Sequence, residues 1–165
     1  MQQEFSPPGW ALSTNIYEMN LRQYTTEGTF KAFASHLPRL KAMGVQTLWF
    51  MPVHPIGKMK RIGTLGSYYS ISDHKAVNPE FGTLDDFKDI IIQAHSMGIR
   101  VMMDWVANHT SWDHVWTKDH PEYYVRDSHG NFQSPYDWQD VIQIDHNSIG
   151  EQQAMIEAMQ FWVNE

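Results

Sequence analysis

The chain contains the same short transition twice, 54 residues apart, and this repeat limits the possible fold more than any other feature. In each copy a helical pattern ends, a glycine follows and an apolar strand begins, as in Lys41-Ala42-Met43-Gly44-Val45 and His95-Ser96-Met97-Gly98-Ile99. Glycine is favoured just past a helix because it adopts the left-handed conformation without steric cost. A repeated βα unit predicts an α/β fold with parallel strands.

Three segments have the hydrophobic pattern of strands. Residues 15–22 alternate, with Tyr17, Met19 and Leu21 expected on one face. Residues 45–51 form a nearly continuous apolar run, which is typical of a parallel strand covered on both faces. Residues 99–106 have similar character. The sequence therefore predicts a sheet of at least three strands.

Helical spacing predicts three helices between and after these strands. The first has apolar positions from Phe30 to Leu40, and Pro38 within it predicts a kink or a break. The second and third begin at capping-box signals, Thr83 with Asp86 and Ser148 with Glu151. The predicted apolar face of the third helix consists of Met155, Ile156, Met159, Trp162 and Val163.

The hydrophobic pattern disappears between Val106 and Ser148, as expected of a functional insert or a small subdomain. The order β-α-β-α-β-insert-α fits either a barrel or a doubly wound sheet. The glycines of Gly63-Thr64-Leu65-Gly66 lack the spacing of a dinucleotide fingerprint and the strand before it, which favours the barrel.

A complete barrel of this type has eight units and about 250 residues, whereas three units are visible here. We therefore expect an incomplete (β/α)8 barrel, with residues 1–106 as its N-terminal part, 107–147 as the insert and 148–165 as the third barrel helix. Its unpaired strand edges predict association or poor solubility when this piece is made alone.

Composition excludes several classes of function. The net charge is −7, with 12 Lys and Arg against 19 Asp and Glu, so we expect no nucleic-acid partner. The absence of cysteine excludes disulfides and a thiolate nucleophile. No apolar run approaches the ~20 residues that cross a bilayer, so no membrane partner is expected.

The segment Met1–Pro8 has no basic stretch followed by an apolar one. We therefore expect no signal peptide and a cytoplasmic location.

Aromatic residues make up 13% of the chain, beside 9 His. Aromatic faces among carboxylates and imidazoles suit a sugar, although core filling would equally explain them.

The most informative stretch is Asp104-Trp105-Val106-Ala107-Asn108-His109, at the predicted end of the third strand. Reactive groups of α/β folds gather at such carboxyl ends. A carboxylate near the end of an apolar run costs free energy unless it is paired or hydrogen-bonded. These residues alone leave open whether Asp104 and His109 form a functional cluster or a solvated strand end.

This stretch resembles the first conserved region of the α-amylase family of glycoside hydrolases. Three further segments resemble parts of the same family. Residues 17–24 resemble its first barrel strand, and residues 66–73 with 77–83 resemble the loop leading to its second barrel helix. Residues 143–147 resemble the motif near the end of its B domain. The resemblance extends from about Asn15 to the last residue in the family's order. It implies the N-terminal portion of an eight-stranded βα barrel with a B domain inserted after strand three.

The resemblance also implies roles for individual residues in binding an α-linked glucan. Tyr69 matches the tyrosine that stacks on a sugar ring, for which an uncharged aromatic plane is suitable. His109 matches the imidazole that hydrogen-bonds the hydroxyls of that ring, since neutral imidazole both donates and accepts. Asp104 matches the aspartate that supports the site from the barrel interior.

A calcium ion between barrel and B domain is found in part of the family. By resemblance, Asn108 and Asp145 would supply two of the several hard oxygens that calcium prefers. The sequence departs from the family at His74, Ile144 and His146, where an aromatic, Pro and Leu are commoner. These departures bear on the metal site and on specificity.

The resemblance places no catalytic residue in this chain. Retaining hydrolysis needs two carboxyl groups about 5–5.5 Å apart, and in the family they follow strands four and five. We therefore expect the 165-residue chain to require the rest of the barrel and to have no turnover alone.

Three alternatives remain open. The protein could be a related α-glucosidase or a transglycosylase of the trehalose-synthase type, or a non-catalytic carbohydrate-binding relative. A metal enzyme of a different class would use His109, Asp113, His114 and His120, but the helical His-Glu-x-x-His spacing is absent.

Overall fold

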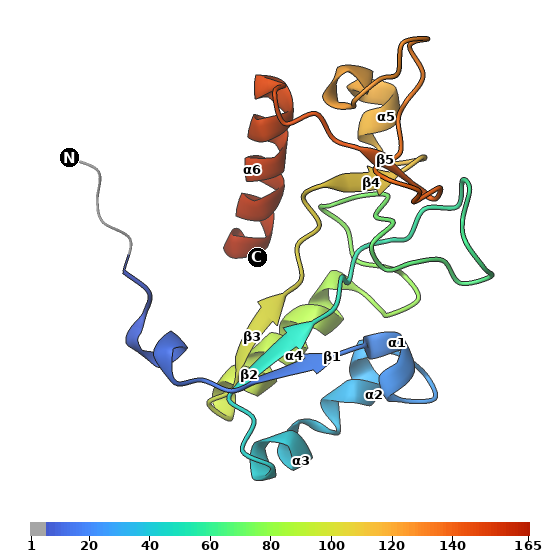
Figure 1. The fold of residues 1–165 in the computed structure, drawn as a ribbon. Coiled ribbons are helices and arrows are strands. Elements are labelled where there is room, and N and C mark those ends of the chain that lie inside the picture. The colour runs from blue at the N-terminus through green and yellow to red at the C-terminus, as the bar shows by residue number, and fades with distance from the viewer. Residues whose placement is uncertain (1–5) are drawn as a thin grey trace.

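The computed structural model describes residues 6–165 (Figure 1). Residues 1–5, on which part of the signal-peptide prediction rests, lie outside the described residues. Three strands form one sheet in the order β1-β2-β3, namely β1 (Ile16–Met19), β2 (Thr47–Phe50) and β3 (Arg100–Met103). Both pairings are parallel, which confirms the predicted α/β fold. Within the described residues, β1 and β3 each keep one unpaired edge.

The strand register separates two faces of the sheet. Tyr17 aligns with Leu48 and Val101 on the face that packs against the helices, where the main hydrophobic core lies. The opposite face carries Glu18 beside Trp49, and it continues to Met102, which is 40% exposed. Because side chains alternate along a strand, the residue after Met103 returns to this second face.

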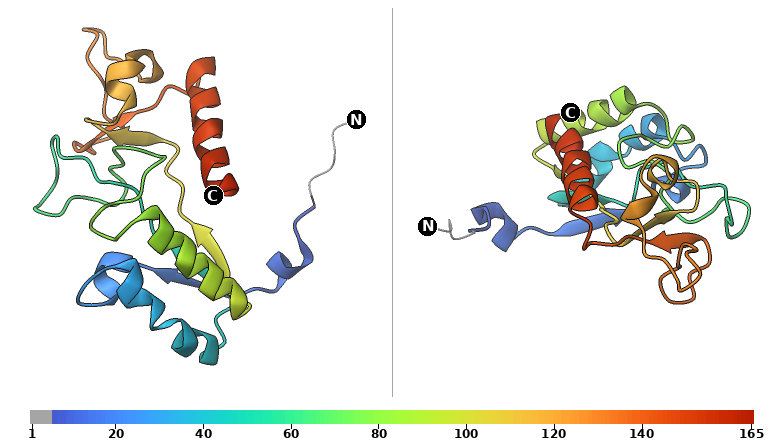
Figure 2. Two further views of the ribbon diagram at one scale, coloured as in Figure 1. Left: turned by 180° about the vertical axis from the view of Figure 1, so that it is seen from behind. Right: turned by 90° about the horizontal axis from the view of Figure 1, so that it is seen from above.

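Four helices lie near the sheet: α1 (Leu21–Tyr24), α2 (Phe30–Ala34), α3 (Leu37–Ala42) and α4 (Leu84–Ser96). The predicted first strand was too long, because β1 ends at Met19 and Leu21 already begins α1. The break predicted from Pro38 is confirmed, and it falls just before the proline, which occupies the first turn of α3. Figure 2 shows these helices from behind the view of Figure 1.

Local signals at the helix ends are confirmed. Thr83 Oγ1 accepts from the backbone of Asp86, whose Oδ2 accepts from the Thr83 backbone at 3.0 Å, so the capping box that starts α4 is complete. Gly44 and Gly98 have φ of 86° and 71°, the left-handed conformation that the repeat predicted.

The insert contains a small antiparallel sheet of β4 (His109–Ser111) and β5 (Val141–Gln143). The insert also contains two short helices, α5 (Trp116–Asp119) and η2 (Pro121–Tyr123), and a further short helix, η1 (Gly9–Leu12), precedes β1. The third predicted strand was also too long, because β3 ends at Met103 and residues 104–108 connect it to β4 without ladder pairing.

Helix α6 (Ile149–Asn164) follows the insert, and its carboxyl end approaches α4 (Figure 2). Ser148 caps it, but the predicted capping box is half formed, because the Glu151 side chain instead accepts from His146 Nδ1 at 3.0 Å. Met155 and Trp162 pack inward. The predicted apolar face was wrong for Ile156, Met159 and Val163, which are 48%, 48% and 85% exposed, because the described residues cover only one side of α6.

No helix among the described residues is long and apolar enough to cross a membrane.

Candidate functional site

Asp104 is the first residue after β3, and its backbone N–H donates to the Phe50 carbonyl at 2.9 Å. By the alternation along the strand, its side chain lies on the face of the sheet that does not carry the main core. Tyr69 Oη donates a hydrogen bond to Asp104 Oδ2 at 3.0 Å. The carboxylate therefore has the partner that its position required, from a loop 35 residues away.

Tyr69 is held in place by its own loop. Its backbone N–H donates to Ser67 Oγ at 3.2 Å. Burial, together with the hydrogen bond to Asp104 and its negative charge, raises the pKa of Tyr69 to about 12. The phenol therefore stays protonated at neutral pH and remains a donor to Asp104.

His109 begins β4 and is buried. Burial lowers the pKa of its imidazole, although the nearby Asp140 carboxylate acts in the opposite direction. The ring is therefore neutral at neutral pH and can both donate and accept, which is what a sugar hydroxyl requires.

One cavity of about 570 Å³ collects several of these side chains. Its lining consists of Ile62, Gly66, Ser67, Tyr69, His109, Trp138, Asp140 and Val141. Tyr69 and His109 thus meet at one cavity, and Asp104 joins them through its hydrogen bond to Tyr69. That these three residues bind a sugar stays a prediction. Their proximity in the structure is consistent with it.

The two residues predicted to hold calcium lie on adjoining segments. The Asn108 carbonyl accepts from the backbone of Ile144, directly before Asp145. Asp145 Oδ1 already accepts two hydrogen bonds from Asn147, at 3.0 and 2.8 Å. Two oxygens are fewer than the six to eight that calcium takes, so these residues alone do not make a calcium site. Calcium stays a prediction.

The metal enzyme based on histidine is not supported by the geometry. His114 lies against His74, Asp113 accepts from the backbones of Lys58 and Met59, and His120 pairs with Glu122. Among residues 6–165 no three His, Asp or Glu side chains come together as a metal site would require. That alternative was wrong.

Sequence reasoning missed a buried cluster of three histidines. His74 Nδ1 lies 3.0 Å from His114 Nε2, and His74 Nε2 lies 2.9 Å from the Val106 carbonyl. His54 stands beside them, at 5.7 Å between ring centroids from His74. Burial lowers the pKa of His54 to about 3 and that of His114 to about 2, and it also lowers the pKa of His74. The three rings are neutral and join the barrel loops to the insert.

The cluster explains one departure from the family pattern. The His74 ring stacks on Trp116 of α5, with an interplanar angle of 18° and 5.3 Å between centroids. Its backbone carbonyl accepts from Trp162 Nε1 of α6 at 2.6 Å. An imidazole therefore replaces the usual aromatic ring and also bonds at both nitrogens.

Sequence reasoning also missed Ile62, Trp138 and Asp140 in the cavity lining, because the loops that carry them show no periodic pattern. Asn20 and Arg22, which follow β1 directly, contact the loop that carries Tyr69. Tyr68 Oη donates to Asn20 Oδ1 at 2.7 Å. The Arg22 guanidinium lies 4.2 Å from the centre of the Tyr68 ring.

Three features together define the class of fold. They are the parallel strands with crossover helices, the insert after the third strand, and the tyrosine–aspartate pair at the carboxyl edge of the sheet. The chain is part of a βα barrel whose site lies at the carboxyl ends of its strands. The model of the family described as "Alpha amylase, catalytic domain" matches residues 13–153, and the chain belongs to this family.

Individual relatives agree with this assignment. An alpha-1,4-glucan:maltose-1-phosphate maltosyltransferase of Rhodospirillum rubrum is 34% identical and covers 90% of this chain. A solved alpha-amylase from Lactobacillus plantarum is 40% identical, with a TM-score of 0.87 over 89% of this chain. A maltogenic alpha-amylase from Thermotoga neapolitana is 39% identical, with a TM-score of 0.88 over 92% of it.

The chain spans 25% of the Rhodospirillum relative and 35% and 36% of the two solved structures. The partial barrel predicted from the three βα units is therefore confirmed.

Proposed function

We propose that the chain is the N-terminal part of the catalytic barrel of an enzyme that acts on α-linked glucans, and that Tyr69, His109 and Asp104 bind one glucosyl unit. The hydrogen bond of 3.0 Å between Tyr69 and Asp104, beside the cavity that Tyr69 and His109 share, is the observation that carries this proposal. The names of the relatives, an alpha-amylase among them, support the substrate class.

Each side chain has a distinct task. The Tyr69 ring offers an aromatic face to the C–H face of a sugar, and Asp104 fixes the orientation of that ring through its hydroxyl. Neutral His109 hydrogen-bonds the hydroxyls of the same unit. Asp104 acts through Tyr69 and is therefore a positioning residue in this scheme.

The nucleophile and the acid/base carboxyl of a retaining mechanism must lie about 5–5.5 Å apart. We propose that residues outside this chain supply both. The 165-residue chain alone then binds sugar without sustained turnover.

The test uses the complete protein encoded by the gene. Release of reducing sugar from starch and maltooligosaccharides is expected for the wild type and not for the 165-residue chain. Tyr69→Phe should keep stacking but lose the bond to Asp104, so a loss of about tenfold in kcat/KM is expected, whereas Tyr69→Ala should lose more. A wild type that binds glucans without turnover would instead identify a non-catalytic relative, and one that does neither would refute the proposal.

Glycosyl transfer is the second candidate reaction, because the Rhodospirillum relative is named a maltosyltransferase. Incubation with maltose 1-phosphate and maltooligosaccharides separates the two reactions. Longer glucans with release of phosphate indicate transfer, and shorter glucans with new reducing ends indicate hydrolysis.

A further inference from the structure

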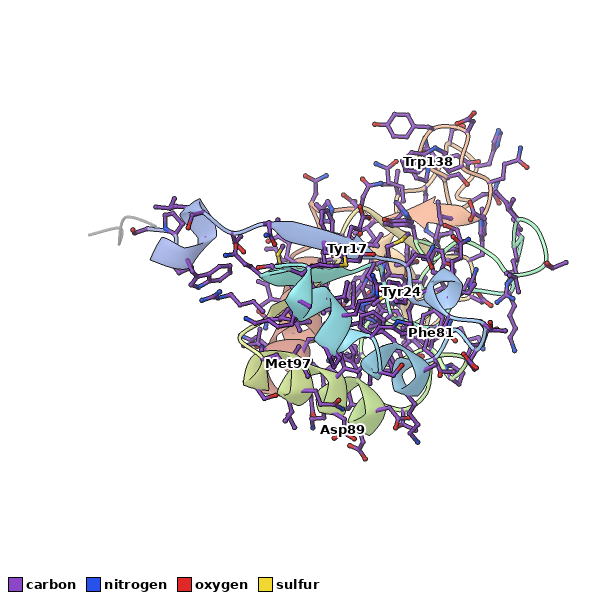
Figure 3. The ribbon with its side chains drawn as sticks, turned by 90° about the horizontal axis from the view of Figure 1, so that it is seen from below. Tyr17, Tyr24, Phe81, Asp89, Met97 and Trp138 are labelled. Carbon is purple, nitrogen blue, oxygen red and sulfur yellow. The ribbon has the colours of Figure 1, made fainter. Side chains whose placement is uncertain are left out.

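The wall of the cavity formed by the insert contains two side chains that the family motifs do not include. Trp138 and Asp140 lie two residues apart in the segment that leads into β5, and both line the cavity with Tyr69 and His109. Figure 3 shows Trp138 at the margin of the molecule, on the side away from Asp89 of α4.

This segment is held by hydrogen bonds from distant residues. Ser70 Oγ donates to the Asp140 carbonyl at 3.0 Å, and Trp112 Nε1 donates to the Gln139 carbonyl at 3.0 Å. Because Ser70 adjoins Tyr69, the first of these bonds ties the segment directly to the loop of the tyrosine. The two walls of the cavity are therefore preorganised relative to one another.

The Asp140 carboxylate faces the cavity and accepts no hydrogen bond from residues 6–165. The residue is only 6% exposed, and no hydrogen bond from the described residues to its side-chain oxygens is found, although its backbone carbonyl is bonded. Since the Asp140 oxygens are not among the buried polar atoms left without a partner, they are accessible from the cavity, where they can accept hydrogen bonds from the hydroxyl groups of a ligand.

The Trp138 indole provides the complementary surface. It is 46% exposed, although it lines the cavity, and its ring meets the His109 ring edge-on at 5.5 Å between centroids. An exposed indole at a cavity rim beside an acceptor suits the apolar face of a sugar. The cavity volume of about 570 Å³ falls in the range of about 300–1,000 Å³ that is common for sites that bind small molecules.

We propose that Trp138 and Asp140 bind a second glucosyl unit, next to the unit that contacts Tyr69 and His109, and thereby make the site selective for oligosaccharides. This inference rests on the proposed function. Trp138 stacks on the apolar face of the second unit, and Asp140 accepts hydrogen bonds from its hydroxyls.

The experiment compares substrates of one and several units in the complete protein. For Trp138→Ala, KM for maltotriose should rise about tenfold, whereas KM for α-glucosyl fluoride, which has a single unit, should stay within about twofold. Trp138→Phe keeps an aromatic face and should retain most of the affinity. Asp140→Asn should raise KM for maltotriose about tenfold through the loss of a charged acceptor.

The matched control is Trp10→Ala, because Trp10 is 39% exposed and lies outside the cavity lining, against Arg100. It should leave KM for both substrates unchanged. An unchanged KM for maltotriose in Trp138→Ala, or an equal loss with α-glucosyl fluoride, would overturn the inference.

Calorimetric titration with maltotriose measures the same contact without turnover. Weaker binding in Trp138→Ala than in Trp10→Ala supports the inference, and equal affinity overturns it even if the enzyme is active. A wild type that neither turns over nor binds any glucan refutes the proposed function instead.

Discussion

Acidification should destabilise the protein through the buried histidine cluster. His54 and His114 are 0% and 1% exposed, and burial holds the pKa of His54 at about 3 and that of His114 at about 2. In the unfolded chain both imidazoles titrate near 6.5. Below that pH the unfolded state binds protons that the folded state does not bind. The free energy of unfolding therefore falls as the pH falls from about 6.5 toward 3.

The size of this destabilisation follows from the difference between the pH and the pKa of each histidine in the unfolded chain. At pH 5 each histidine lies about 1.5 units below its unfolded pKa, and at about 1.4 kcal/mol per unit each contributes about 2 kcal/mol of destabilisation. Together the two should lower the free energy of unfolding by about 4 kcal/mol between pH 8 and pH 5. This is a large share of the 5–15 kcal/mol that is typical of domains.

Urea unfolding of the complete protein at a series of pH values measures this dependence. Tryptophan emission should report it, since Trp105, Trp116 and Trp162 surround the cluster. His114→Gln, which stays neutral, should reduce the loss between pH 8 and pH 5 by about 2 kcal/mol, whatever its effect at pH 8. An equally steep pH dependence in this variant, or a flat one in the wild type, would show that the buried histidines do not cause the loss of stability.

Three further changes test the packing around the site by thermal or urea unfolding. Gly57→Ala would place a Cβ 2.2 Å from Ser111 Cβ, so a loss of about 1–3 kcal/mol is expected, and a neutral result would contradict the close approach. Thr83→Ala removes the cap of α4 and should cost about 1 kcal/mol, while Thr83→Ser should be nearly neutral. Trp162→Phe loses the bond to the His74 carbonyl and should cost about 1 kcal/mol; no change would mean that α6 is not anchored there.

Local features of the fold were predictable with few errors. The capping box at Thr83 and the left-handed Gly44 and Gly98 depend on bonds and torsions within a few residues. Errors occurred where burial depends on packing against residues distant in the sequence. The apolar face of α6 was predicted from periodicity, but Ile156 and Val163 are exposed because none of the described residues packs over them.

The βα units and their parallel order were predictable from the sequence, because strand ends follow from chain order. That Tyr69, Asp104 and His109 belong to one site was predicted only from the resemblance to the α-amylase family. That Trp138 and Asp140 complete the cavity is visible only in the folded protein. Their partners lie in loops that the sequence separates widely and that carry no periodic pattern. The same holds for the neutral histidine cluster, since an imidazole's charge depends on burial by residues that become neighbours only after folding.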